Sequence, residues 1–296
     1  MEDALEALIN IYEFLTKTMD TPGNFGWFHI VCIGVIAVLS VVLSAAFRHS
    51  SDRAVNRFVT LTWVVLLLLE IYKQLIFGFE LQDGVFTWDY AWYAFPFQFC
   101  SSPLYVLPVI AFTRRTRTRN ACIAYMVSFS FFAGLAVLCY PNDVFISTIG
   151  INIQTMVHHG SQVILGFVLA TRYRRRMNSR FFFGGVRVFV IMCAIAMLLN
   201  IGVYKYFAAH GITDTFNMFY VSPYFDCTLP VLSMFNGKVS YPVFFAIYVF
   251  GFTLCAILVF GILKGLTRVT SKSEHADVLY TPVRSRQAVK SYKYKQ

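Results

Sequence analysis

The sequence predicts an all-α, polytopic membrane protein with seven transmembrane helices, its N-terminus outside and its C-terminus in the cytoplasm. Of the 296 residues, 57% are hydrophobic and only 14% are charged, and the mean hydropathy is +0.61. Soluble domains are about half apolar and about a quarter charged. The composition therefore excludes a soluble globular enzyme, a disordered chain and a fibre. Seven cysteines in so long a chain are too few for a disulfide-rich scaffold.

Seven stretches are long and apolar enough to cross a bilayer, which takes roughly 20 residues of α-helix. They are residues 25–47, 58–79, 93–113, 121–140, 149–171, 181–204 and 241–266. Residues 1–24 form an external segment that begins with an amphipathic helix. The long aromatic loop 205–240 is expected to cover the outside as a lid. The tail 267–296 is basic and is expected to be disordered and cytoplasmic.

The distribution of charge sets the predicted orientation. Arginines are concentrated at residues 48–57, 114–119 and 172–180, and the tail is rich in lysine and arginine. Seven crossings place these four segments on one side and most of the carboxylates on the other. Because basic connections stay in the cytoplasm, the N-terminus is predicted to be outside. The net charge of +10 thus indicates a multi-pass protein of the cell membrane and no nucleic-acid partner.

Polar side chains inside the predicted spans indicate a functional site, because such groups are costly in a bilayer. At about 1.5 Å of rise per residue, His29, Glu70, Cys100 and His158 all lie within about 13 Å of the outer boundary. This shared depth predicts a polar cavity among four spans, open toward the outside. The expected substrate-binding residues are His29, Glu70, Lys73, Gln98, Gln154, Gln162 and, from the external loop, Asn217.

Cys100 is the candidate nucleophile. It stands between Pro96 and Pro103, in a span that proline is expected to bend. A thiol becomes a nucleophile when a base or cation favours the thiolate, and His158 or His159 lies at a similar depth. The alternative interpretation makes Cys100 an inert apolar residue and the two histidines packing residues that join helices.

Two further pairs have more than one interpretation. Glu70 and Lys73 are one helical turn apart and either form a structural ion pair or bind a ligand. Cys139 and Cys227 both fall near the outer side, so a disulfide between them is an open alternative. No metal or cofactor is predicted, because Glu70 and the histidines do not have the spacing of a metal-binding motif.

Taken together, these residues resemble the YwaF family of bacterial integral membrane proteins over most of the chain. The residues that carry the resemblance are His29, Glu70, Pro96 with Cys100, His158-His159-Gly160, and Asn217-Met218-Phe219-Tyr220 with Pro223. Gln98 stands where that family usually has a histidine or similar polar residue. The family is distantly similar to the animal transmembrane protein 164 family, whose members use a membrane cysteine to move fatty acyl chains between phospholipids. The resemblance implies that Cys100 accepts the acyl group and that His158 or His159 is the general base.

The sequence thus supports two functions. The first is a thiol-dependent phospholipid acyltransferase or acyl hydrolase, whose partners are membrane phospholipids. The second is a non-enzymatic transporter or binding component that holds a small-molecule ligand at Glu70, Lys73 and the histidines. A seven-helix receptor is disfavoured, because the chain has no Asp-Arg-Tyr motif and no Asn-Pro-x-x-Tyr motif in the expected spans.

Overall fold

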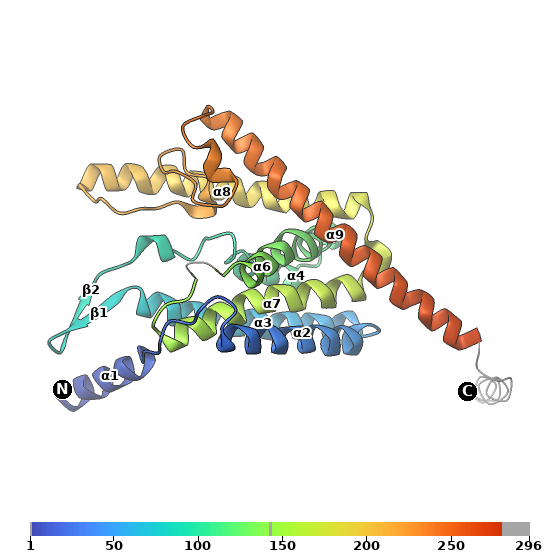
Figure 1. Cartoon of the computed structure of the whole chain (residues 1–296), viewed down its shortest axis with the longest axis horizontal. Helices are drawn as coiled ribbons and strands as arrows, with labels where there is room; N and C mark the ends of the chain where they lie inside the picture. The colour runs from blue at the N-terminus through green and yellow to red at the C-terminus, as the bar shows by residue number, and fades with distance from the viewer. Residues whose placement is uncertain (1, 142–143, 280–296) are drawn as a thin grey trace.

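The protein is mainly helical and its helices run side by side (Figure 1). This computed structural model describes residues 2–141 and 144–279. Within these residues, five helical rods are long and apolar enough to cross a membrane, so the chain is a multi-pass membrane protein. They are α2 (Trp27–Phe47), α3 (Asp52–Ile76), α5 with α6 (Thr116–Tyr125 and Phe131–Cys139, joined by a π-helical turn at Met126–Ser130), α8 (Ser179–His210) and α9 (Tyr241–Leu279). The remaining α-helices are α1 (Glu2–Leu15), α4 (Pro103–Phe112) and α7 (Ile149–Arg172).

α7 is the central helix of the bundle. It contacts α2 and α3 on one side and α6 and α9 on the other, while α8 packs against α5 (Figure 1). Most residues of α7 are buried, so its polar side chains face protein and not lipid. This enclosure explains why α7 is long enough to span a bilayer but is not among the apolar spans.

Small residues let α6 approach α7 closely. A Cβ atom on Gly134 of α6 would lie 2.6 Å from the carbonyl oxygen of His159 and 2.8 Å from the Cβ atom of Gln162. The first of these contacts is with backbone, which cannot move aside as the tip of a flexible side chain can. Gly134 therefore sets the distance between α6 and the part of α7 that carries the histidines.

The predicted span 93–113 is not a continuous helix, which corrects the sequence analysis. A 3-10 turn at Trp92–Ala94 is followed by an irregular segment, residues 95–102, and regular helix begins only at Pro103 with α4. Proline lacks a backbone donor and disfavours helix in the residue before it. Pro96 and Pro103 therefore interrupt the helix, and Pro103 takes the first helical position, where proline is favoured.

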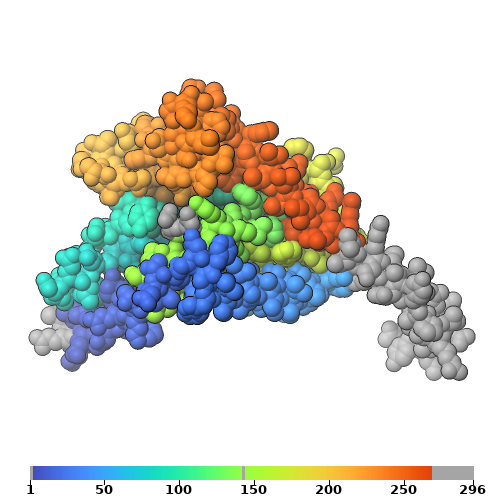
Figure 2. All heavy atoms as spheres, viewed as in Figure 1, coloured from blue at the N-terminus to red at the C-terminus, as the bar shows by residue number. Residues whose placement is uncertain are grey.

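A β-hairpin follows α3 and is absent from the predicted all-α fold. α3 ends at Ile76, and β1 (Phe79–Gln82) pairs with β2 (Val85–Trp88). The turn is Asp83-Gly84, with φ of 50° and 76°, and both residues adopt the positive φ of a tight hairpin turn. Together with α1, the hairpin projects from one end of the molecule (Figures 1 and 2).

The external loop and the tail begin later than predicted. α8 continues to His210, and the loop 212–240 forms a raised mass beside it, with short 3-10 turns at Met218–Tyr220 and Leu232–Phe235 (Figure 2). α9 continues to Leu279, past the predicted end of the last span, and residues 280–296 of the predicted tail lie outside the described residues. Cys139 is exposed, Cys227 is buried, and both are free thiols, so the two do not form the disulfide that was left open.

We predict that Gly134→Ala lowers the unfolding free energy by about 1–3 kcal/mol, because the added methyl group overpacks α6 against the backbone of α7. Thermal unfolding of the purified protein in detergent measures the effect. Gly251→Ala in α9 is the matched control, since a Cβ atom there meets nothing within 4 Å. Equal melting temperatures for the two variants would contradict this close approach of α6 to α7.

Candidate functional site

Two side chains of α7 hydrogen-bond the backbone carbonyl of Cys100. The Nε2 atom of His158 lies 3.0 Å from this carbonyl oxygen, and the Nε2 atom of Gln162 donates to it over 2.6 Å. His158 and Gln162 are one helical turn apart, so they approach the same oxygen from one face of α7. An unpaired carbonyl in an apolar environment costs several kcal/mol. The polar stripe of α7 therefore satisfies the irregular segment.

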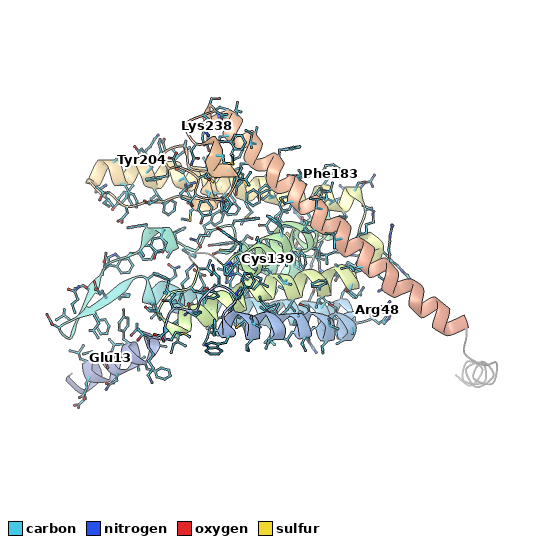
Figure 3. The ribbon with its side chains drawn as sticks, in the orientation of Figure 1. Glu13, Arg48, Cys139, Phe183, Tyr204 and Lys238 are labelled. Atoms are coloured by element: carbon cyan, nitrogen blue, oxygen red, sulfur yellow. The ribbon has the colours of Figure 1, made fainter. Side chains whose placement is uncertain are left out.

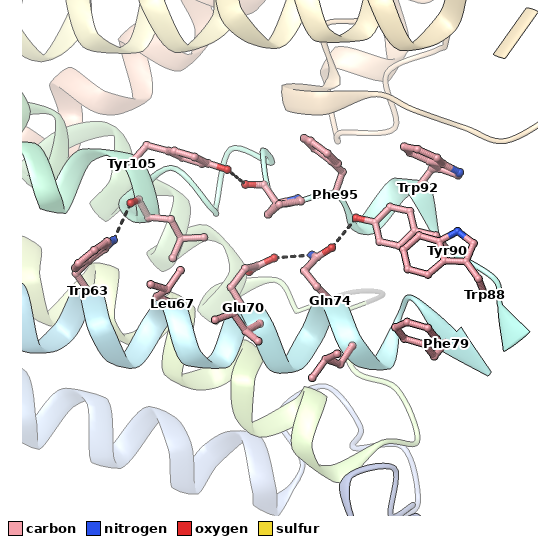
Figure 4. Close-up of a pocket in the computed structure, with 14 residues that line it drawn as sticks. Trp63, Leu67, Glu70, Gln74, Phe79, Trp88, Tyr90, Trp92, Phe95 and Tyr105 are labelled. Carbon is pink, nitrogen blue, oxygen red and sulfur yellow. Dashed lines mark hydrogen bonds between the residues drawn. The ribbon is translucent and has the colours of Figure 1, made fainter. Parts of the chain in front are cut away.

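Other polar side chains satisfy the carbonyls on either side of Cys100. The donors and acceptors are Gln98 Nε2 to Tyr93 (2.7 Å), Gln74 Nε2 to Ala94 (2.9 Å), Tyr105 hydroxyl to Pro96 (2.6 Å) and Trp63 Nε1 to Leu104 (2.9 Å). Figure 4 shows the bond of Trp63, from α3, to Leu104 and the bond of Tyr105, from α4, to Pro96. Several polar side chains that the sequence assigned to a ligand site thus hydrogen-bond backbone carbonyls in or beside the irregular segment.

The contacts of each histidine determine which ring nitrogen carries its proton. A carbonyl only accepts hydrogen bonds, so His158 donates from Nε2 and, as neutral imidazole, has an unprotonated Nδ1. This Nδ1 atom is buried and has no hydrogen-bond partner among the described residues. His159 has the opposite tautomer, because its Nδ1 atom donates to the Thr155 carbonyl over 2.8 Å. The His158 nitrogen that contacts Cys100 is therefore the donor Nε2, and the free basic nitrogen of this ring is Nδ1.

The Cys100 thiol donates to the side-chain oxygen of Gln98, at a sulfur–oxygen distance of 3.7 Å. His158 therefore contacts the backbone of Cys100, whereas Gln98 contacts its sulfur. Lys73 interacts electrostatically with Cys100 and with both histidines. Of the four side chains that the sequence grouped by depth, Cys100 and His158 thus come together, and the expected binding residues Lys73 and Gln98 join them in one cluster around Cys100.

A chain of polar contacts runs from Lys73 through Glu70 and Gln74 to Tyr90. One carboxylate oxygen of Glu70 pairs with Lys73 Nζ at 2.9 Å and accepts from Gln74 Nε2 at 2.8 Å. Tyr90 donates its hydroxyl to Gln74 Oε1 over 2.5 Å. Burial and, second, the nearby Glu70 carboxylate raise the pKa of Tyr90 to about 12, so its hydroxyl remains a donor at neutral pH. The ion pair left open by the sequence is therefore formed, inside a larger network.

A lateral groove of about 680 Å³ opens between α3 and residues 79–105 (Figure 4). Its walls are mainly apolar and aromatic and come from Trp63, Leu67, Ile71, Leu75, Phe79, Trp88, Trp92, Phe95 and Leu104. Glu70 lines it as well, is only 4% exposed, and keeps its second carboxylate oxygen without a hydrogen-bond partner in the described part of the chain. The groove thus differs from the polar cavity among four spans that the sequence predicted. Polar side chains expected to line that cavity instead hydrogen-bond the backbone of the irregular segment.

The loop 212–240 covers the irregular segment. Phe219 is buried, with its ring centroid 5.6 Å from that of Phe97 and 5.4 Å from that of Phe99. Asn200 of α8 fixes the loop by pairing through both amide atoms with the backbone of Met218. Phe219 and Tyr220 both adopt φ of 57°, a left-handed conformation that costs non-glycine residues roughly 1–2 kcal/mol each. The loop is therefore held in place by burial, as expected of a lid.

Three predicted site residues lie apart from the cluster. His29 is buried between the rings of Phe25 and Phe145, and its Nδ1 atom accepts from the Phe25 amide over 3.1 Å. Asn217 joins the backbone of Ser222 and Asp226 within the external loop. Gln154 is buried on α7, two turns before Gln162. His29 and Asn217 thus hydrogen-bond backbone close to their own positions in the chain, apart from the cluster around Cys100.

The sequence analysis did not identify Trp63, Tyr90, Tyr105 and Asn200 as site residues. The first three are aromatic and count as apolar in a hydropathy profile, although each carries a polar tip that usually finds a partner when buried. Asn200 carries a clearer signal, since an asparagine inside an apolar span seldom faces lipid.

The comparisons with known proteins give one match. The model of the TMEM164 family matches residues 24–264, which include α2 to α8, the irregular segment, the loop 212–240 and most of the apolar part of α9. No curated protein and no solved structure matches the chain.

We predict that Gln162→Leu lowers the unfolding free energy by about 1 kcal/mol, because the Cys100 carbonyl loses one of its two donors. Thermal unfolding in detergent gives the measurement, and Gln154→Leu makes the same chemical change on the same stripe of α7. We expect Gln154→Leu to melt at a higher temperature than Gln162→Leu. The reverse order would show that the Cys100 carbonyl does not depend on Gln162.

Proposed function

This chain belongs to the TMEM164 family, and we propose that it is a thiol-dependent phospholipid acyltransferase or acyl hydrolase. The observation that carries the proposal is the contact of His158 with the carbonyl oxygen of Cys100. It brings a buried imidazole, whose Nδ1 atom has no described partner, to the residue that carries the thiol. Nucleophile and base are the two groups that covalent acyl transfer requires.

The proposed chemistry has two steps. In the first, His158 Nδ1 takes the proton of the Cys100 thiol, which turns from Gln98, and the sulfur attacks the ester carbonyl of a phospholipid. The carbon–oxygen ester bond breaks, a thioester forms, and the leaving lysolipid takes the proton from the imidazole. In the second step, the hydroxyl of another lysolipid, or water, attacks the thioester and restores the thiol. The acceptor decides between acyl transfer and hydrolysis.

Lys73 supports the first step because its ammonium group interacts electrostatically with Cys100. A cation near a thiol stabilises the thiolate that attacks the ester. The Glu70 carboxylate, bonded to Lys73 at 2.9 Å, holds the ammonium in place. The Glu70–Lys73 pair is thus proposed to act on the charge at Cys100.

The lateral groove fits the acyl chain of the substrate. Its apolar walls match a hydrocarbon chain, and on this proposal a phospholipid would enter it from the bilayer. Cys100 belongs to the turn whose two ends, Pro96 and Leu104, line this groove. The lid residue Phe219 packs on the same turn and would exclude water from a thioester.

We also propose that the chain crosses the cell membrane seven times, with its N-terminus outside. α7 and the irregular segment with α4 would add two crossings to the five apolar ones. Figure 3 places Glu13 and Arg48 at opposite ends of the helices, in line with the side expected for arginine-rich connections. The resemblance to the YwaF family, read from His29, Glu70 and Cys100, remains part of this proposal.

Lipid or small-molecule binding without covalent chemistry is the second candidate function. It is favoured by the partner of the thiol, because the Cys100 sulfur bonds to Gln98 and not to a histidine. On this proposal the groove and the unpartnered Glu70 oxygen would bind a ligand, and Cys100 would serve only as backbone.

We predict that Cys100 becomes acylated by a phospholipid that carries an alkyne-tagged acyl chain. The purified protein in phosphatidylcholine nanodiscs is incubated with this lipid, and covalent label that hydroxylamine releases is quantified as thioester. Cys100→Ala removes this label, and His158→Phe slows its appearance by about 100-fold or more, the usual contribution of a general base.

Cys255→Ala is the matched control, because Cys255 is a partly buried cysteine of α9. We expect this variant to label at the wild-type rate. Wild-type labelling of Cys100→Ala would exclude the thiol mechanism. Tight but non-covalent retention of the tagged lipid by all the variants would favour the second candidate.

A further inference from the structure

A second hollow, of about 910 Å³, lies on the same α3–α4 seam at its opposite end. Phe47 at the end of α2, the first turns of α3, and Ala111 and Phe112 at the end of α4 line it. Trp63 lines the lateral groove and Phe112 lines this hollow, and their rings meet edge-on at 6.2 Å. The two concave sites share no lining residue and are divided by the contact between Trp63 and Phe112.

The lining of this hollow has an apolar and a basic part. Leu61 and Phe112 are 67% and 63% exposed, and both belong to helices in the membrane region. Arg53 and Arg57 stand one helical turn apart on α3. Neither guanidinium has a hydrogen-bonding or ionic partner among the described residues. The hollow therefore offers two uncompensated positive charges beside an exposed hydrocarbon surface.

The carboxylate in the lining, Asp52, is paired with a different arginine and not with Arg53 or Arg57. Asp52 bonds to Arg172 at 3.1 Å and accepts from the Tyr173 hydroxyl at 3.0 Å. Tyr173 in turn accepts from Arg119, which also donates to Asn56 of the lining over 2.7 Å. This network fixes the wall of the hollow, and Arg53 and Arg57 are exposed beside it.

We propose that this hollow binds an anionic phospholipid from the leaflet on the arginine-rich side of the membrane. The headgroup phosphate would lie between Arg53 and Arg57, and an acyl chain would follow Leu61, Val64 and Phe112 toward the bilayer centre. Paired arginines suit a phosphate, and basic hollows between transmembrane helices favour anionic headgroups. A zwitterionic lipid is disfavoured, because its ammonium group would meet the two positively charged arginines.

The site is independent of the acyl-transfer proposal. The residues that would bind the phosphate lie on the same turns of α3 as Asp52 and Asn56, which join α3 to α7 and α5. A bound lipid would therefore stabilise the joint between these helices. It would do so whether or not Cys100 carries out chemistry, because it binds the folded state alone.

Native mass spectrometry of the detergent-purified, full-length protein tests the proposal, with dioleoyl-phosphatidylglycerol as the probe and dioleoyl-phosphatidylcholine as the comparison. We expect wild type to retain phosphatidylglycerol preferentially. Arg53→Gln/Arg57→Gln should weaken its retention by about thirtyfold, since each arginine contributes about fivefold near an anionic headgroup. Leu61→Ser should weaken it as well, and added glycerol 3-phosphate should not compete, because the acyl chain is part of the ligand.

The matched control is Arg175→Gln/Arg180→Gln, which removes two exposed arginines outside the hollow. We expect it to retain phosphatidylglycerol as wild type does. Unchanged retention by Arg53→Gln/Arg57→Gln, equal losses in both double variants, equal retention of phosphatidylcholine by wild type, or competition by glycerol 3-phosphate would each overturn the proposal. Unchanged melting of the lipid-free variants would confirm that both double variants fold.

Discussion

The backbone of residues 95–102 imposes the constraint on which the rest of this structure depends. Pro96 and Pro103 interrupt the helix, and the carbonyl groups released there need hydrogen-bond donors where they are buried. Two side chains of α7, His158 and Gln162, meet this requirement by donating to the carbonyl of Cys100. A helix with so polar a stripe must be enclosed, and the other helices surround it accordingly.

The same need for hydrogen bonds to the backbone also determines where the proposed reaction would take place. A cysteine in an ordinary helix would have its carbonyl bonded along the helix and its side chain packed as a small apolar group. At Cys100 the backbone carbonyl instead hydrogen-bonds the imidazole of His158. This structural contact brings the proposed general base to the residue that carries the thiol. One contact thus serves both the stability of the irregular segment and the proposed reaction, and a variant that breaks it is expected to affect both.

Much of the fold and part of the site could be predicted from the sequence. α2, α8 and α9 face lipid over most of their length, and hydropathy reports such helices directly. The polar side chains of α7 and α3 could be recognised because lipid does not tolerate them. The partner of each side chain could not be predicted, because it depends on the path of the irregular segment. For the same reason His29 shares the depth of Cys100 but packs between Phe25 and Phe145.

The carbonyl carbon of Cys100 is accessible to one direct measurement. Cys100-Ser101 is the one Cys-Ser pair in the sequence, so protein labelled with [1-¹³C]cysteine and [¹⁵N]serine gives a single carbonyl–amide correlation by NMR. A carbonyl with two donors is deshielded. We predict that its resonance moves upfield in Gln162→Leu, moves further upfield when His158→Phe is added, and stays in place in Gln154→Leu. An unchanged resonance in the double variant would contradict the dependence of the irregular segment on α7.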